Sequence, residues 1–139
     1  MDILQDSCEL NEMYQLYGMA SHHCSNIEYQ IIYLLLGPEW SKIEDLDPDK
    51  ITKVKDELSS KPLGALFKIY QQHFQFSSEI IEEMKMILDK RNYLIHRFFG
   101  GYGKKMHDKA VVNEMIEELK MLISTFQSAS YSLDPSRWK

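Results

Sequence analysis

Apolar residues recur at three- and four-residue steps along most of this chain, which is the spacing of one face of an α-helix. The first such pattern runs from about Ser7 to Leu36 and predicts a long amphipathic helix. Gly37-Pro38 follows directly and predicts the end of that helix. The apolar stripe comprises Leu10, Met13, Tyr14, Tyr17, Ala20, Cys24, Ile27, Ile31 and Leu34 or Leu35.

The middle of the chain predicts two short helices. Asp47 is placed to cap a polar helix that starts at Pro48 and runs to about Ser59. Lys61-Pro62 then restarts the chain, and a second short helix with one apolar face follows. That face comprises Leu63, Leu66, Phe67 and Tyr70, with Phe74 as a candidate fifth member.

Two longer helices complete the pattern. Ser77 or Ser78 caps the first, and the glutamates in its early turns suit the helix dipole. The segment 100–105, rich in glycine, predicts a loop with a basic tip, and the last helix runs from about Asp108 to Ser132. The two apolar stripes are Ile80, Ile81, Met84, Ile87, Leu88, Leu94, Ile95 and Phe98, and then Val111 or Val112, Met115, Leu119, Leu122, Phe126 and Ala129.

These elements predict an all-α protein: an antiparallel helical bundle of about four to five helices, with residues 1–139 forming one domain. The longest apolar run, Ile31 to Leu36, is too short to span a bilayer. The N-terminus is acidic and polar, unlike a secretion signal. We therefore expect a cytoplasmic protein that does not enter a membrane.

Charge is distributed unevenly along the chain. The net charge of −5 argues against general nucleic-acid binding. Between Lys85 and Lys109, however, seven cations face only two acidic residues. A local phosphate site would produce this distribution, and so would a solvated helix end that carries lysines.

The sequence predicts neither a disulfide framework nor a metal site. Cys8 and Cys24 lack metal-finger spacing and are expected to be buried or idle thiols. Adjacent helical residues point about 100° apart, so His22-His23-Cys24 does not readily hold one metal ion. The acidic stretch 44–49 lacks the central glycine and closing glutamate of a calcium-binding EF-hand loop.

Three side chains of different chemistry lie within six residues: the guanidinium of Arg91, the amide of Asn92 and the imidazole of His96. A fixed cation, an orienting hydrogen-bond group and a proton carrier are what binding or cleaving a phosphodiester needs without a metal. On a regular helix Asn92 and His96 lie on one face, which Lys85 and Asp89 extend. We call these four residues the polar seam; Arg91 lies at its edge.

The same residues also fit a purely structural role. Asn92 and His96 could hydrogen-bond each other or a neighbouring loop, while Arg91 pairs with Asp89 or with a distant glutamate. Residue types alone leave both interpretations open.

The segment Arg91 to His96 resembles the Arg-(four to six residues)-His motif of HEPN domains, in which a polar residue, often Asn, commonly follows the arginine. Its position near the end of a late bundle helix also matches. Leu63 to Phe67 is similar to a Leu-Gly-x-Leu element of bacterial relatives. The helix order covers most of the chain, whereas the specific match covers about six residues.

The resemblance implies a homodimer with a composite, metal-independent endoribonuclease site that needs no cofactor. His96 would act as general base or acid in attack of the 2′-hydroxyl on the adjacent phosphate, leaving a 2′,3′-cyclic phosphate. Arg91 would hold the phosphate, and Asn92 would orient the phosphate or the histidine. Many relatives are toxins or antiviral effectors, so an antitoxin or another protein partner is also expected.

Residues around the motif extend this expectation to RNA contacts. Arg97, Lys104 and Lys105 are candidates for contacting backbone phosphates, and Tyr102 for stacking on a base. In one subgroup of HEPN toxins a tyrosine that is modified by a partner stands two residues after the histidine. Phe98 occupies that position here, so this form of regulation is not expected.

Two alternatives to the ribonuclease remain at the level of sequence. In the first, the chain is a catalytically silent HEPN-like module that binds a protein partner or a nucleotide through the polar seam. Otherwise it is a plain structural bundle in which His96 is buried and hydrogen-bonded, and an exposed His96 would exclude that role.

Overall fold

The computed structural model describes residues 8–40 and 48–133, and over these ranges the chain is helical with no strand. The elements are α1 (Cys8–Trp40), α2 (Pro48–Ser59), α3 (Leu63–His73), α4 (Ser78–Asn92), a π-helical turn η2 (Tyr93–Arg97), α5 (Phe98–Tyr102), a 3-10 turn η3 (Gly103–Lys105) and α6 (Lys109–Ser132). Because α4, η2 and α5 follow one another without a break, the described chain has five helical segments. The predicted all-α bundle is confirmed.

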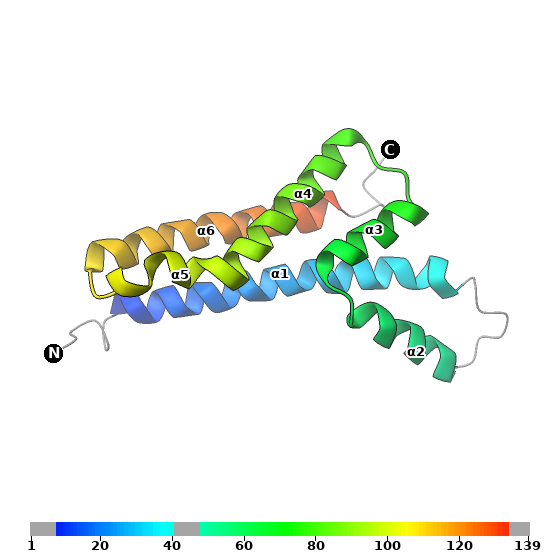
Figure 1. Ribbon diagram of the computed structural model, residues 1–139, viewed down its shortest axis with the longest axis horizontal. Helices are drawn as coiled ribbons and strands as arrows, with labels where there is room; N and C mark the ends of the chain where they lie inside the picture. The colour runs from blue at the N-terminus through cyan, green and yellow to red at the C-terminus, as the bar shows by residue number, and fades with distance from the viewer. Residues whose placement is uncertain (1–7, 41–47, 134–139) are drawn as a thin grey trace.

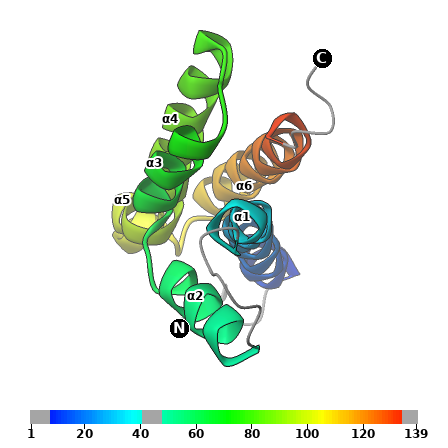
Figure 2. The same ribbon diagram turned by 90° about the vertical axis from the view of Figure 1, so that its right-hand side faces the viewer.

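Helices α1 and α6 lie side by side and run in the same direction (Figures 1 and 2). Near their first turns, Lys109 Nζ lies 3.4 Å from Glu9 Oε1. Towards their other ends, Gln30 Nε2 donates to the carbonyl of Ser130 over 2.8 Å, and Ser130 Oγ donates to Gln30 Oε1 over 2.6 Å. The segment α4–η2–α5 runs back over this pair in the opposite direction (Figure 1).

The two short helices pack at one end of the α1–α6 pair. Helix α3 contacts both α1 and α4, and α2 contacts α1. An added Cβ at Gly64 would lie 3.4 Å from Leu88 Cδ2, which is ordinary van der Waals contact. The packing of α3 on α4 therefore does not require the glycine of the Leu-Gly-x-Leu element.

The core combines the apolar stripes of all five segments, and among the described residues no polar or charged residue is fully buried. Buried Tyr70 donates its hydroxyl to the carbonyl of Leu133 over 2.9 Å, so its polar end is satisfied. Tyr14 was predicted in the stripe but is 51% exposed, because it lies at the edge of α1 beside Phe99. The buried apolar residues of the two long helices are Met13, Ala20, Cys24, Ile27, Ile31 and Ile32 in α1, and Val112, Met115, Ile116, Leu119, Leu122, Ile123, Phe126 and Ala129 in α6.

Several predicted helix starts are confirmed. Ser77 Oγ accepts a hydrogen bond from the backbone of Ile80 at 3.3 Å, and Asp108 Oδ1 accepts one from Ala110 at 3.0 Å. Pro48 is the first residue of α2, as predicted. The predicted cap Asp47 lies outside the described residues.

Two predicted breaks are wrong. Helix α1 continues through Gly37-Pro38 to Trp40, although a proline there removes one backbone hydrogen bond and crowds the carbonyl four residues earlier. Gly100 and Gly101, predicted to begin a loop, are helical residues of α5. Each glycine costs about 1 kcal/mol of helix propensity, which packing of the neighbouring Phe98 offsets. No described glycine adopts a positive φ.

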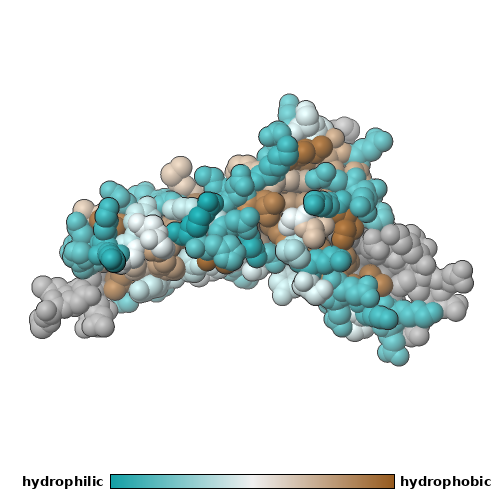
Figure 3. Space-filling view, viewed as in Figure 1, coloured by the Kyte–Doolittle hydropathy of each residue, from teal (hydrophilic) through white to brown (hydrophobic). Residues whose placement is uncertain are grey.

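Within the described residues, no helix combines the length and the apolar composition required to cross a membrane. Hydrophilic residues cover most of the face shown in Figure 3, and hydrophobic residues gather mainly where α3 lies beside α4.

The core assignment predicts different outcomes for two residues of α6. Phe126 is fully buried, so Phe126→Ala should lower the free energy of unfolding by about 3–5 kcal/mol through loss of burial and creation of a cavity. Met121 is 71% exposed, so Met121→Ala should change it by less than about 0.5 kcal/mol. Urea denaturation followed by circular dichroism measures both values, and equal effects would contradict the placement of α6.

Candidate functional site

The motif residues lie where α4 gives way to a π-helical turn. Arg91 and Asn92 are the last residues of α4, and His96 belongs to η2. A π turn closes backbone hydrogen bonds over five residues instead of four, and such turns inside α-helices are frequently found at functional sites. Tyr17 of α1 donates its hydroxyl to the carbonyl of Leu94 over 3.2 Å, which ties the turn to α1.

The π turn changes the helix register after Asn92. The prediction of a regular helix placed Ile95 in the core, but Ile95 is 42% exposed while Leu94 and Phe98 are buried. On an α-helix, residues five apart point about 140° from each other. The wider turn reduces the angle between Arg91 and His96, and it disturbs the predicted alignment of His96 with Asn92.

Arg91 is held by two groups of its own chain. Its Nε lies 3.6 Å from Glu28 Oε1 on α1, and its Nη1 donates to Asn92 Oδ1 over 3.2 Å. The pair is partly buried, with the side chains of Arg91 and Glu28 exposed by 25% and 31%. Of the two pairings left open by the sequence, Asp89 or a distant glutamate, the structure shows the second, and the glutamate is Glu28. The sequence could not identify it, because a partner 63 residues away leaves no local pattern.

Cys24 lies one turn before Glu28 and is buried. Burial raises the pKa of its thiol to about 12, and the charge of Glu28 acts in the same direction while Arg91 opposes it. Cys24 is therefore protonated at neutral pH and unreactive as a nucleophile. Cys8 is exposed, and both thiols are free.

His96 is exposed. Within the described part of the chain, no hydrogen bond or ion pair engages its imidazole, and the hydrogen bond of Arg91 goes to Asn92 instead. The alternative of a plain bundle with a buried, hydrogen-bonded His96 is therefore wrong.

The four candidate RNA contacts lie in three places. Arg97 is exposed, and its guanidinium carbon lies 5.9 Å from the centre of the Tyr93 ring. Tyr102, predicted in an open loop, is half-buried at the end of α5 and donates to Glu118 Oε2. Lys104 and Lys105 are exposed in η3.

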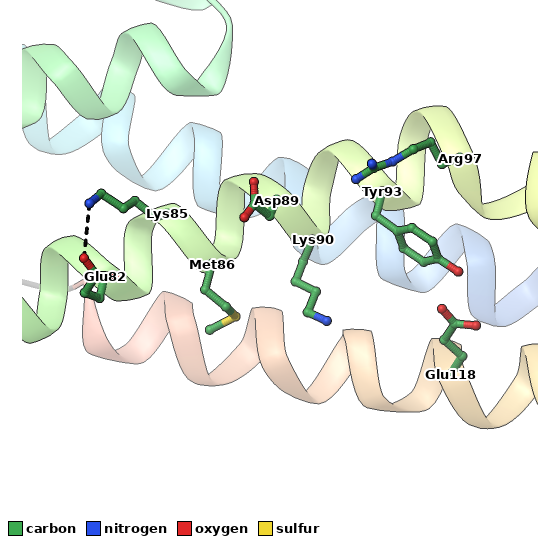
Figure 4. Close-up of a pocket in the computed structure, with 8 residues that line it drawn as sticks. All are labelled: Glu82, Lys85, Met86, Asp89, Lys90, Tyr93, Arg97 and Glu118. Carbon is green, nitrogen blue, oxygen red and sulfur yellow. Dashed lines mark hydrogen bonds and ion pairs between the residues drawn. The ribbon is translucent and has the colours of Figure 1, made fainter.

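A groove of about 650 Å³ lies between α4 and α6 (Figure 4). We call it the α4–α6 groove. Its lining comprises Glu82, Lys85, Met86, Asp89, Lys90, Tyr93, Arg97 and Glu118. The groove therefore includes Lys85 and Asp89 of the polar seam but not Arg91, Asn92 or His96. The three- and four-residue spacing along α4 could have predicted most of this lining, whereas Glu118 comes from α6.

Glu118 lies opposite two phenols at one end of the groove. The pKa of Tyr93 is raised to about 12 by burial, and further by the carboxylate of Glu118 nearby. The hydrogen bond to Glu118 also raises the pKa of Tyr102 above its ordinary value, and burial adds to this effect. Both phenols are therefore protonated under physiological conditions, and Tyr102 donates its hydroxyl to Glu118.

Over residues 8–40 and 48–133, no three or more His, Cys, Asp and Glu side chains come together as a metal-binding group. Comparison of the chain with models of protein families, with curated proteins and with solved structures found no match.

The raised pKa of Tyr93 predicts a loss of stability at alkaline pH. Between about pH 10 and about 12 the unfolded phenol releases its proton while the folded one keeps it, so the free energy of unfolding falls with rising pH. Urea denaturation across this range measures the effect. Tyr93→Phe lacks the ionisable group and should lose less stability than wild type, and identical pH dependence of the two proteins would contradict the assignment.

Proposed function

We propose that this protein is a metal-independent endoribonuclease of the HEPN type that acts as a homodimer. The observation that carries the proposal is the arrangement around η2. Arg91 and Asn92 end a helix, a π turn follows, and the turn presents His96 to solvent with its imidazole free of partners in the described chain.

Each residue has a role that suits its chemistry. His96 would remove the proton from the 2′-hydroxyl of RNA or donate one to the leaving 5′-oxygen. Arg91 would bind the phosphate and stabilise the charge that develops on it. Its contacts with Glu28 and Asn92 use Nε and Nη1, and a guanidinium has five N–H donors, so donors remain for a phosphate. Asn92 would orient Arg91, the phosphate or the imidazole.

A second copy of the chain completes this mechanism. One imidazole cannot act as base and acid in the same step, whereas two imidazoles that face each other across a two-fold axis can. Exposed apolar side chains near the motif are the candidates for such an interface. Ile95, which directly precedes His96, is exposed, and the ring of exposed Tyr14 lies 6.2 Å from that of half-buried Phe99.

The biological setting follows from the same resemblance. An RNA-cleaving protein of this type would act in the cytoplasm as a toxin or an antiviral effector, with an antitoxin or another protein partner restraining it. The position of the modified tyrosine of one toxin subgroup is held by Phe98, which is buried. Restraint by modification at that position is therefore not part of the proposal.

The second candidate is a catalytically silent HEPN-like module that binds a protein partner. The ion pair of Arg91 with Glu28 favours it, since an arginine held within its own chain is already satisfied without a phosphate. This candidate predicts a dimer that leaves RNA intact but loses its partner when Arg91 is changed to alanine.

Ribonuclease assays with EDTA present distinguish the two candidates. The wild-type protein should cleave RNA to 2′,3′-cyclic phosphate ends, and His96→Ala should lower the rate by about 10²–10⁴-fold, the usual contribution of general acid–base catalysis. His107→Ala is the matched control, because His107 is exposed and outside the motif. Equal activity of His96→Ala and wild type would reject the mechanism, and intact RNA with wild type would favour the silent module.

The dimer is tested by analytical ultracentrifugation. Ile95→Glu places a charge in the proposed interface and should shift the protein from dimer to monomer and abolish cleavage, since each site needs both copies. Met121→Glu makes the same change at an exposed position of α6 and should leave the dimer intact. A wild-type protein that cleaves RNA as a monomer would contradict the composite site.

A further inference from the structure

We propose that the α4–α6 groove binds a ribonucleoside phosphate, either as a free nucleotide or as one nucleotide of a single RNA strand. The groove does not include Arg91, Asn92 or His96. The proposal therefore does not depend on whether those residues cleave RNA.

The size and construction of the groove suit a small ligand. Its volume of about 650 Å³ falls within the range of about 300–1,000 Å³ that is typical of small-molecule sites. Most of the lining comes from one helix, α4, and Figure 4 shows Met86, Lys90 and Tyr93 extending from it towards α6. A ligand placed there would contact a row of side chains from one helix and the carboxylate of Glu118 opposite them.

Two cations of the groove are available to a phosphate. Lys85 is engaged by Glu82, whose Oε1 lies 3.1 Å from its Nζ. Among the described residues, neither Lys90 nor Arg97 has a carboxylate within ion-pair distance. They are seven residues apart, about 10 Å along a helix, so a phosphate bound by either one leaves the rest of the groove to the remainder of the ligand.

Tyr93 lies between these cations in the sequence and supplies an aromatic surface. The guanidinium of Arg97 lies 5.9 Å from the centre of its ring, so the two side chains present an aromatic plane and a cation next to each other. Aromatic rings and guanidinium planes are both surfaces on which unpaired bases stack. Met86, partly exposed two turns earlier, adds an apolar contact.

The carboxylates determine which anion fits. Asp89 and Glu118 repel any phosphate in the groove, so a phosphate binds there only as part of a ligand that makes further contacts. A carboxylate readily accepts hydrogen bonds from ribose hydroxyls. Glu118 accepts one from Tyr102 and retains further acceptor capacity, because a carboxylate has about four acceptor positions. A ligand with a phosphate, a ribose and a base can therefore contact the cations, the carboxylates and the aromatic ring of the groove, respectively.

Isothermal titration calorimetry of the full chain at low salt tests the ligand class. The probes are adenosine monophosphate, its 2′-deoxy form, inorganic phosphate and single-stranded oligoadenylate. Adenosine monophosphate and the oligonucleotide should bind competitively, the 2′-deoxy form more weakly and inorganic phosphate weakest. If the oligonucleotide binds more tightly, the natural ligand of the groove is an RNA strand. If the mononucleotide binds more tightly, the natural ligand is a free nucleotide.

The proposal is overturned if neither ribonucleotide probe binds, or if inorganic phosphate or the 2′-deoxy form binds as well as adenosine monophosphate.

Substitutions locate the ligand. Lys90→Ala should weaken binding of adenosine monophosphate by about tenfold, the cost of losing one charge-assisted hydrogen bond, and Tyr93→Leu should weaken it similarly by loss of stacking. Lys68→Ala removes the same charge from an exposed position on α3 and should bind as wild type does. Circular dichroism confirms that each variant is folded, and a folded Lys90→Ala that binds unchanged would refute the proposal.

His96→Ala separates this inference from the proposed nuclease. It should bind adenosine monophosphate as wild type does, even if it no longer cleaves RNA. Loss of binding in His96→Ala with binding retained in Lys90→Ala would place the ligand at the motif and overturn the assignment to the groove.

Discussion

The packing of α1 against α6 is the interaction on which the rest of the structure depends. The two longest helices run in the same direction and bury their apolar stripes against each other and against the segments that cover them. Polar contacts at both ends, Glu9 with Lys109 and Gln30 with Ser130, fix the register of the pair. This pair supplies the surface over which α4, η2 and α5 lie, and so it determines where the motif residues stand.

Two side chains of that surface contact the candidate site directly. Tyr17 holds the carbonyl of Leu94 within the π turn, and Glu28 holds the guanidinium of Arg91. Both come from α1, three turns apart, and they lie on either side of the point where the register of the covering segment changes. The geometry of Arg91 and His96 is therefore set jointly by their own segment and by a helix far away in the sequence.

Periodicity was sufficient to predict the helical segments and most of their buried faces. The caps at Ser77 and Asp108 were predictable as well, because a side-chain oxygen at a helix start leaves a local pattern. The π turn was not predictable, since nothing in Tyr93 to Arg97 departs from an ordinary helical composition, and the exposure of Ile95 follows from it. Partners contributed by other helices, Glu28 for Arg91 and Glu118 for Tyr102, depend on the tertiary fold, which no local spacing encodes.

The parallel arrangement of α1 and α6 has a consequence for synthesis of the chain. Gln30 and Ser130, which hold the pair together, are 100 residues apart in the sequence. During translation α1 emerges from the ribosome long before α6 exists, so the part of its apolar stripe that packs on α6 lacks that partner for most of that time, although α2 and α3 follow soon after. Contacts between such distant segments also slow folding. That part of α1 is therefore an aggregation-prone apolar surface until the last helix has been made.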